Sequence, residues 1–346
     1  MKTRLHTARL ALAEPLRISR STMAARDAVW LTVEHDGTAG HGEAVSSTYL
    51  GLDTDTLRRL LGAVPLTRFA TPESALEALK AGELTPPDTP AAVTAAVESA
   101  LLDLVGRRAG LPVHRLLGAP EAPVAATART IGITTPARAA AEARRLVARG
   151  FETVKVKAGT ADPEDDLARV RAVRDAAPGA RLLLDPNGAW SPALATALLP
   201  RYAALGVEAV EQPLAPGDPE ALCALAERSP LPVIADEDAV TLDDARRLAG
   251  RVHGVNVKLA QCGGVHAALR IAEAIEGSGT RLMLGCLTAS TLSLAPAVHL
   301  ADRAHWTDLD GHLLLARDPW TGIGGENGHV RASGRPGLGV TRADLA

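Results

Sequence analysis

Cysteines are few in this sequence, and their spacing excludes several kinds of site. Cys223, Cys262 and Cys286 lie far apart in a chain of 346 residues, and they form no CxxC or Cys/His pattern. A structural zinc site requires such a pattern, and a disulfide framework requires an even set of cysteines. The sequence therefore predicts a reduced, cytoplasmic protein without a thiolate metal site.

Long apolar runs and blocks of one charge are also missing. The apolar stretch after Lys2 is interrupted by His6, Arg9 and Glu14, so it does not read as a signal peptide. No later run is long enough to span a bilayer. The formal net charge is −3, and the arginines are scattered among acids, which argues against a surface for nucleic acid. We expect a homo-oligomer that acts on a small molecule, with no nucleic-acid or membrane partner.

Lysine is scarce as well, because arginine provides most of the 37 basic side chains. Three of the five lysines lie in two short valine-rich runs, at residues 153–157 and 255–258. A guanidinium stays protonated, whereas an ε-amine releases its proton once burial and a neighbouring charge lower its pKa. Plain surface charge is the alternative, but valine-rich runs read as buried strands. The sequence predicts proton-transfer chemistry at Lys155, Lys157 and Lys258.

Residues 1–122 read as an α+β unit. Residues 28–34 alternate between apolar and polar side chains, and a turn at residues 35–38 leads to a second strand at residues 40–44. Helical patterns follow from residue 54 to residue 118. The clearest helix spans residues 91–109, because its apolar side chains fall on one face and a glycine and a proline follow it.

After residue 123 the sequence repeats one pattern, in which a short apolar run precedes a helical segment rich in alanine, leucine and arginine. The runs are residues 124–133, 153–157, 181–185, 207–211, 233–236, 254–258, 281–285 and 305–308. This period is typical of parallel βα units, and eight of them predict an α/β fold with a (β/α)8-type TIM barrel over residues 123–318, capped by the α+β unit. An open doubly wound sheet is the alternative, although such sheets seldom carry polar residues at so many strand ends. Residues 319–346 are expected to pack back on the capping domain.

An acidic residue ends three consecutive runs: Asp185, Glu211 and Asp236. The C-terminal ends of barrel strands form one mouth, so these carboxylates would repel one another unless a cation neutralised them. Each acid alone is more often a helix N-cap, but three in succession predict a metal site. Oxygen ligands favour a hard dication, and Mg²⁺ rather than Ca²⁺ keeps positions open for substrate. The residues expected to orient these ligands are Asn187, Gln212 and Glu237.

Lys157 and Lys258 end the second and the sixth run. Strands four apart lie on opposite walls of an eight-stranded barrel, so the two amines are expected to face each other across the mouth. Two bases on opposite faces of one carbon suit a racemase or epimerase, and a dication would stabilise the enediolate formed next to a carboxylate. A lysine acts as a base at neutral pH only when its pKa is lowered, and Lys155 projects from the same side of the strand to do this for Lys157.

The eighth run ends in two acids, Asp308 and Asp310, on one side of the strand and opposite the metal. Two acids remote from the cation suit an ammonium group at the far end of the substrate. A solvated turn is the alternative reading of this segment. Thr130, in the first run, is a further candidate substrate contact.

Taken together, these motifs resemble the enolase superfamily in its muconate-lactonising-enzyme subgroup, and within it the dipeptide epimerases. Residues 155–157 are similar to the KxK motif, whose second lysine is a catalytic base that the first supports. Residues 256–264 resemble the segment of the second base, and residues 308–310 resemble the DxD signature that holds a dipeptide's α-ammonium. The resemblance implies that Asp185, Glu211 and Asp236 are the Mg²⁺ ligands. Segments 42–44, 100–105 and 110–118 resemble the family's capping domain.

The resulting hypothesis is a Mg²⁺-dependent epimerase that acts on dipeptides at the α-carbon of the C-terminal residue. Many relatives carry an acid where this chain has Ala289, which leaves the side-chain preference open. In the family a capping-domain loop contributes to that preference, and here Arg20 in this loop suits an acidic C-terminal residue. The rivals are muconate cycloisomerisation, N-acylamino acid racemisation and o-succinylbenzoate synthesis, whose substrates lack a free α-ammonium. A non-catalytic barrel that only binds a ligand is a further alternative.

Overall fold

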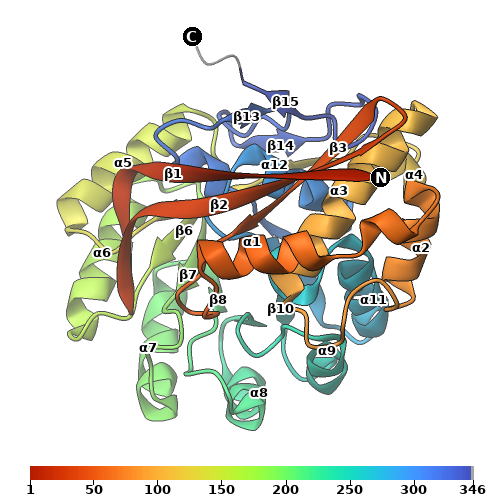
Figure 1. The fold of residues 1–346 in the computed structure, drawn as a ribbon. Coiled ribbons are helices and arrows are strands. Elements are labelled where there is room, and N and C mark those ends of the chain that lie inside the picture. Colours follow the sequence, from red (N-terminus) through yellow and green to blue (C-terminus); the bar gives the residue numbers. More distant parts are fainter. Residues whose placement is uncertain (344–346) are drawn as a thin grey trace.

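The N-terminal part of the chain forms an antiparallel sheet that is covered by helices (Figure 1). The computed structural model describes residues 1–343. Its first sheet has the order β1 (Lys2–Ile18), β2 (Ser21–His35), β3 (Thr38–Val45). The helices that follow are α1 (Thr54–Ala63), η1 (Leu66–Arg68), α2 (Pro72–Lys80), α3 (Ala91–Ala109) and α4 (Val113–Leu116). This arrangement confirms the predicted α+β capping domain.

Eight parallel strands form the second part, and their order in the sheet follows their order in the chain. They are β5 (Ala128–Ile131), β6 (Thr153–Lys157), β7 (Arg181–Asp185), β8 (Val207–Glu211), β9 (Val233–Ala235), β10 (Gly254–Lys258), β11 (Arg281–Gly285) and β12 (Trp306–Asp308). A doubly wound sheet would reverse its strand order at a switch point. No reversal occurs within the described residues, so the predicted barrel is confirmed over the open sheet.

The first predicted run, residues 124–133, is divided between two sheets. Its beginning is β4 (Val124–Ala126), which pairs with β14 (His329–Arg331) outside the barrel, and only β5 joins the barrel. The break falls at Thr127, whose backbone N–H donates to Gly328 O at 2.8 Å. The expectation of one continuous strand here is therefore wrong.

Side chains join the first barrel strand to the last. The Thr127 Oγ1 accepts from the backbone N–H of Leu309 at 2.8 Å, and the Asp310 carboxylate accepts from the backbone N–H of Thr130 at 2.7 Å. Within residues 1–343 no regular ladder pairs β12 with β5. The barrel therefore closes partly through Thr130 and Asp310, which the sequence predicts to be substrate contacts.

The barrel helices begin at strong sequence signals. They are α5 (Pro136–Ala148), α6 (Pro163–Ala176), α7 (Pro192–Ala204), α8 (Pro219–Arg228), α9 (Leu242–Leu248), α10 (Leu259–Cys262), α11 (Val265–Ile275) and α12 (Thr291–Val298), with the short turns η2 (Ala301–Arg303) and η3 (Gly311–Leu314). Helices α5 to α8 each start with a proline behind an N-cap side chain that accepts a backbone N–H. A proline is well placed there, because the first helical N–H has no partner within the helix.

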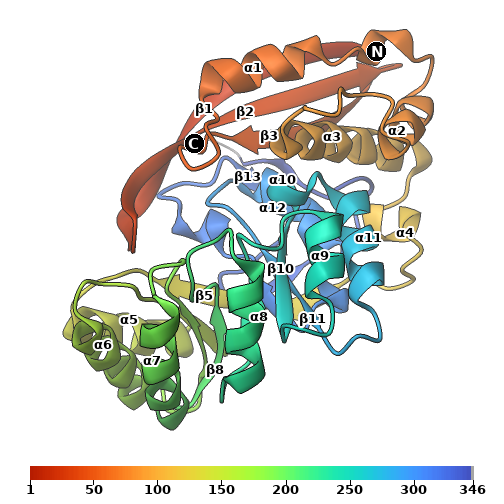
Figure 2. The same cartoon turned by 90° about the horizontal axis from the view of Figure 1, so that it is seen from below.

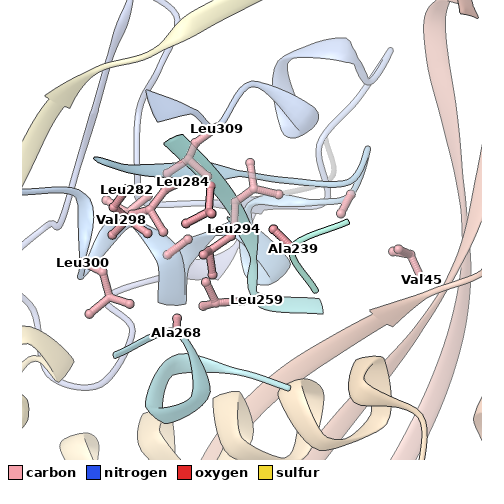
Figure 3. Packing of buried hydrophobic residues seen from close by; sticks show 14 of the residues in the cluster. Val45, Ala239, Leu259, Ala268, Leu282, Leu284, Leu294, Val298, Leu300 and Leu309 are labelled. Atoms are coloured by element: carbon pink, nitrogen blue, oxygen red, sulfur yellow. The ribbon is translucent and has the colours of Figure 1, made fainter. Parts of the chain in front are cut away.

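The core consists of leucine, valine and alanine, as the scarcity of aromatic residues requires. Figure 3 shows part of it, where side chains such as Leu282, Leu284 and Val298 pack between strand and helix. A separate buried cluster comes from six barrel strands, as is expected of side chains that fill a barrel. Its members are Ala128, Leu183, Ala209, Ile234, Met283 and Trp306.

The C-terminal segment contacts the capping sheet. It contains β13 (Trp320–Thr321) and β15 (Thr341–Arg342), which pair with each other. Trp320 meets Trp30 of β2 edge to face, with ring centroids 5.8 Å apart, and the Arg342 guanidinium lies 4.3 Å from the centre of the Trp30 ring. Among residues 1–343, each helix is too short or too polar to traverse a lipid bilayer.

Figure 2 shows the capping domain as a layer beside the barrel. Two buried glutamates of the capping domain cap the N-termini of barrel helices. Glu98 on α3 accepts the backbone N–H groups of Val265 and His266, so it occupies the N-terminus of α11, which follows the Lys258 strand. A side chain at Gly264 would meet this carboxylate, because an added Cβ would stand 2.0 Å from Oε2.

Glu43 on β3 makes the second contact between the capping domain and a barrel helix. It accepts the Trp30 Nε1–H at 2.6 Å and the Ser290 backbone N–H at 2.9 Å, and it contacts the Ser290 hydroxyl. Ser290 is the N-cap of α12, and it ends the loop that follows β11. The two glutamates therefore fix the capping domain over the C-terminal ends of β10 and β11.

Glu43 predicts a specific pH dependence of stability. Burial raises the pKa of Glu43 to about 7, although Ser290 and Trp30 donate to the carboxylate. The unfolded chain releases this proton near its ordinary pKa of 4.5, while the folded chain holds it until about pH 7, so stability falls as pH rises between these values. Relative to Glu43→Gln, the wild type is expected to lose about 3 kcal/mol over this range. Urea unfolding of both proteins at several pH values measures the difference, and a difference independent of pH would contradict the assignment.

Candidate active site

Two strands on opposite sides of the barrel carry the three lysines of interest. Lys155 and Lys157 lie on β6, the second strand, and Lys258 ends β10, the sixth. In the sheet register Lys157 stands beside Asp185, Lys258 beside Gly285, and Gly285 beside Asp308. These positions therefore share one level of the barrel, at the C-terminal ends of its strands.

Lys155 is the centre of a buried ion-pair network. Its side chain is 2 % exposed, and its Nζ lies 2.6 Å from Glu211 Oε2, 2.7 Å from Asp308 Oδ2 and 3.1 Å from Asp185 Oδ2. Burial lowers the pKa of Lys155, but these carboxylates outweigh it and raise the pKa well above its ordinary value. Lys155 is therefore a permanent cation in this arrangement, placed between acids from three strands.

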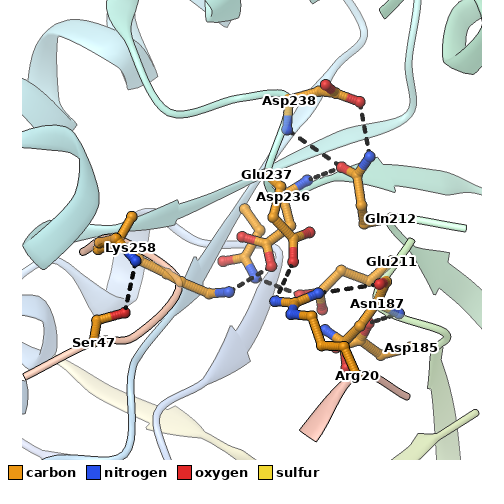
Figure 4. A network of polar contacts seen from close by, with 12 residues as sticks. Arg20, Ser47, Asp185, Asn187, Glu211, Gln212, Asp236, Glu237, Asp238 and Lys258 are labelled. Atoms are coloured by element: carbon orange, nitrogen blue, oxygen red, sulfur yellow. Dashed lines mark hydrogen bonds and ion pairs between the residues drawn. The ribbon is translucent and has the colours of Figure 1, made fainter. Parts of the chain in front are cut away.

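The other two lysines each contact one of the predicted metal ligands. Lys157 forms a short ion pair with Asp185, and Lys258 Nζ lies 2.5 Å from Asp236 Oδ2 (Figure 4). Burial alone raises the pKa of Asp185, but the lysines lower it far below its usual range. The charge of Lys258 contributes to this lowering although Lys258 stands on the opposite wall. Its ammonium therefore acts on the same cavity as that of Lys157.

The pKa of Lys258 differs from what general-base chemistry needs. Burial lowers it, but the charges of Asp236 and Glu211 outweigh burial, and the pKa lies above its ordinary value. The physical reason is that the buried carboxylates paired at the mouth contact ammonium groups, and Lys155 is shared among three of them. A lysine base near neutral pH therefore requires another cation to take over these carboxylates.

The three predicted ligand acids fit such a cation chemically. Asp185, Glu211 and Asp236 are each at most 1 % exposed, and one ammonium already touches the first two. Within residues 1–343 the acidic, histidine and cysteine side chains form no preassembled metal cluster, because lysines stand between the carboxylates. Asp236 Oδ1 is buried and has no hydrogen-bond partner among these residues. A hard dication takes oxygen donors of this kind.

Of the three residues predicted to orient the acids, Asn187 and Gln212 contact a ligand residue, whereas the side chain of Glu237 pairs with Arg20. The backbone N–H of Asn187 donates to Asp185 Oδ1 at 2.9 Å, and Gln212 Oε1 accepts the backbone N–H of Asp236 at 2.9 Å. Asn187 and Gln212 have φ values of 50° and 35°. Left-handed backbone is costly for residues other than glycine, and it persists where the surroundings enforce it, often at functional sites.

Glu237 connects the barrel mouth to the capping domain. Its Oε1 pairs with Arg20 Nη2 at 2.8 Å, and Arg20 also donates to the backbone oxygen of Asn187 at 3.1 Å (Figure 4). The Arg20 guanidinium lies 4.8 Å from the centre of the Tyr49 ring. Arg20 thus joins two capping-domain segments to the metal side of the mouth, and its charge is balanced there.

Asp308 ends β12 and Asp310 follows it, and the two carboxylates have different partners. Asp308 contacts Lys155, and its Oδ1 is buried without a hydrogen-bond partner among residues 1–343. Burial raises the pKa of Asp308 to about 6, against the lowering effect of Lys155. Asp310 accepts from the Thr130 backbone N–H and pairs with Arg129 Nη1 at 3.1 Å. Thr130 contributes its backbone N–H to this contact.

Sequence reasoning missed several residues of this site. Asn256 Nδ2 donates to Glu211 Oε1 at 2.9 Å, and Asp238 accepts from Gln212 Nε2 at 2.7 Å. Asn256 could have been found, because it lies two residues before Lys258 and therefore on the same side of the strand. Asp238 carried no such signal, since its contact depends on the loop after β9.

The chain is similar to known proteins over nearly its whole length. The family model described as the enolase C-terminal domain-like family matches residues 138–344, and that of the mandelate racemase / muconate lactonizing enzyme N-terminal domain matches residues 1–118. An L-Ala-D/L-Glu epimerase of Bacteroides thetaiotaomicron is 31% identical over 91% of this chain and 81% of its own length. A hydrophobic dipeptide epimerase of Roseobacter litoralis is 33% identical over 98% of both chains.

A solved structure extends the likeness to three dimensions. The dipeptide epimerase of Enterococcus faecalis V583, crystallised with Mg and the dipeptide L-Leu-L-Tyr, superposes with a TM-score of 0.92 at 29% identity. The match covers 98% of this chain and 99% of that one. These relatives differ in the side chains named in their substrates, so the likeness leaves the side-chain preference open.

Proposed function

Because the chain belongs to the mandelate racemase / muconate lactonizing enzyme family of the enolase superfamily, we propose that it epimerises dipeptides at the α-carbon of the C-terminal residue. It is then an isomerase that uses Mg²⁺. The observation that carries the proposal is the series of side chains at the mouth. Five consecutive strands, β6 to β10, each end in or are followed by one of its members. The members are Lys157, Asp185, Glu211, Asp236 and Lys258.

Asp185, Glu211 and Asp236 would hold the Mg²⁺. Bound there, Mg²⁺ supplies the positive charge that stabilises a substrate carboxylate when its α-carbon loses a proton. The contacts of Asn187, Gln212 and Asn256 hold these acids in place at the mouth. This orientation supports metal binding by these acids.

Lys157 and Lys258 move the proton. Lys258 Nζ pairs with Asp236, and the charges of Asp236 and Glu211 hold its pKa above its ordinary value. A dication held by these acids would offset their charge, and Lys258 would then be able to act as a base. The two amines then stand on opposite walls, and one removes the α-proton while the other returns a proton to the opposite face. Lys155 keeps its charge next to Glu211 and orients this side of the cavity.

The far end of the dipeptide would lie at Asp308 and Asp310. Two buried carboxylates, one with an unpaired oxygen, suit the α-ammonium of the N-terminal residue. Thr130 fixes Asp310 through its backbone N–H. Arg20 would border the side chain of the C-terminal residue, but Glu237 balances its charge, so this contact by itself does not favour an acidic side chain.

A dipeptide library in D₂O tests the function. The protein is incubated with Mg²⁺ and dipeptides, and mass spectrometry follows the gain of one deuterium at the α-carbon while chromatography follows the second diastereomer. Both are expected for at least one dipeptide. N-acylamino acids, which lack the α-ammonium, are expected to react poorly. Exchange with N-acylamino acids and with no dipeptide would favour the rival racemase, and no exchange at all would favour a binding protein.

Metal binding predicts a change in stability that does not require activity. After treatment with a chelator, addition of Mg²⁺ is expected to raise the melting temperature, because a ligand that binds only the folded state stabilises it. Asp236→Asn removes one ligand and one buried charge, and it is expected to lose most of this rise. Asp243→Asn, at an exposed position on α9, is the matched control and should keep it. An equal rise in all three proteins would place the metal elsewhere.

A further inference from the structure

Arg26 on β2 is a partly buried arginine whose charge is not balanced. Its Nε and Nη2 both lie 3.4 Å from the sulfur of Met23, and its Nη1 is buried without a hydrogen-bond partner among residues 1–343. A thioether is a weak acceptor. Burial lowers the pKa of Arg26, and the ionisable group that acts against this is Cys286. No carboxylate of the described chain compensates this guanidinium.

Other arginines near the mouth are already paired. Arg20 pairs with Glu237 at 2.8 Å, and Arg129 pairs with Asp310 at 3.1 Å. A buried cation without an anion is costly, because it has lost its hydration and gained no counter-charge. The buried Nη1 of Arg26 has no hydrogen-bond partner among residues 1–343, unlike the paired guanidinium groups of Arg20 and Arg129, so it requires an explanation.

The register of β2 places Arg26 on the face of the capping sheet that turns toward the loop after β11. Side chains alternate along a strand, so Arg26 lies on the same face as Trp30, which donates to Glu43 and through it contacts the loop after β11. Cys286 begins that loop and accepts the backbone N–H of Gly311 at 3.3 Å. The charges of Asp308 and Asp310 also act on the Cys286 thiol, and they raise its pKa after burial. Arg26 therefore lies on the side of the capping sheet that faces the ends of β11 and β12, with Cys286 as its neighbouring ionisable group.

We propose that Arg26 binds a carboxylate on the side chain of the substrate's N-terminal residue. This inference rests on the proposed function, because Asp308 and Asp310 are there assigned to the α-ammonium of that residue. The side chain of the same residue must lie within a few bonds of the ammonium. Arg26 brings an uncompensated cation to that side of the site, so dipeptides that begin with Glu or Asp match its charge.

The test compares two nearly isosteric substrates in the Mg²⁺-loaded enzyme, L-Glu-L-Ala and L-Gln-L-Ala. The wild type is expected to prefer L-Glu-L-Ala by roughly 10- to 100-fold in kcat/KM, the range for a hydrogen bond to a charged group. Arg26→Gln is expected to abolish this preference and to keep its activity on L-Gln-L-Ala. Arg9→Gln, an exposed arginine on β1 of the same sheet, is the matched control and should retain the preference.

Melting temperatures separate a binding role from a structural one. Without substrate, Arg26→Gln is expected to melt higher than the wild type by about 2 °C or more, because a buried unpaired charge is removed. Arg26→Met, of similar length, gives the same test without a hydrogen-bonding group. A lower melting temperature in both variants, with the substrate preference intact, would make Arg26 a structural cation and overturn the inference.

The same assays separate the role of Arg26 from the proposed epimerase function. If the wild type epimerises other dipeptides but does not discriminate L-Glu-L-Ala from L-Gln-L-Ala, the inference fails and the proposed function stands. If no dipeptide exchanges its α-proton, both fail.

Discussion

Lys157→Gln and Lys258→Gln are each expected to abolish epimerisation and to leave α-proton exchange from one epimer only. In the proposed mechanism each lysine would face one side of the α-carbon, so the remaining amine would still remove and return a proton on its own side. Loss of a positioned base costs about 10²- to 10⁴-fold in rate. Proton NMR in D₂O, with the L,L and the L,D substrate in separate reactions, measures the rate of epimerisation and the rate of α-proton exchange. The two variants should show opposite preferences.

Lys80→Gln is the matched control for this experiment. Lys80 ends α2 and pairs with Glu77 on the surface of the capping domain, far along the chain from the barrel strands. Its loss is expected to leave exchange from both epimers intact. If both active-site variants lost exchange from the same epimer, the two amines would not face opposite sides of one carbon.

Asp308→Asn is expected to lower kcat/KM for a dipeptide by about 10²- to 10³-fold. The variant removes the charge that would pair with the substrate's α-ammonium, and breaking one side of a buried charged contact costs several kcal/mol. N-acetylated dipeptides have no ammonium, so their slow turnover should change little. The ratio of kcat/KM for the free dipeptide to that for the N-acetylated dipeptide therefore separates recognition of the ammonium from general damage to the site.

Asp310→Asn and Asp302→Asn complete this comparison. Asp310 also accepts hydrogen bonds from the Thr130 backbone and from Arg129, where the first barrel strand meets the last. Its variant is therefore expected to lose stability as well as activity. Asp302 lies exposed on η2, and its variant should behave as the wild type. Equal losses on free and acetylated dipeptides in Asp308→Asn would argue against an ammonium site.

The residues at strand ends could be predicted because two local signals coincide there. Asp185, for example, follows a run of leucines, and a strand of that kind in a βα repeat places its last side chain at the mouth. Lys157 and Lys258 stood out since lysine is rare in this chain. Such inferences need only the strand period and the barrel's symmetry.

The contacts between the capping domain and the barrel could not be predicted in this way. Glu43, Glu98 and Arg26 gain their roles from contacts with segments more than 150 residues away in the chain or from the absence of a partner. Neither depends on a local pattern. The division of the first run at Thr127 has the same origin, because its backbone pairs with Gly328. The pKa of Lys258 was likewise set by which acids surround it.

A crystal structure with Mg²⁺ and a slowly reacting dipeptide would place both amines relative to the reacting carbon. The proposed mechanism requires the Nζ atoms of Lys157 and Lys258 to lie on opposite faces of the substrate α-carbon, each about 3 to 3.5 Å from it. Asp185, Glu211 and Asp236 should all coordinate one ion that also binds the substrate carboxylate. Two amines on the same face, or an ion held by other residues, would contradict it.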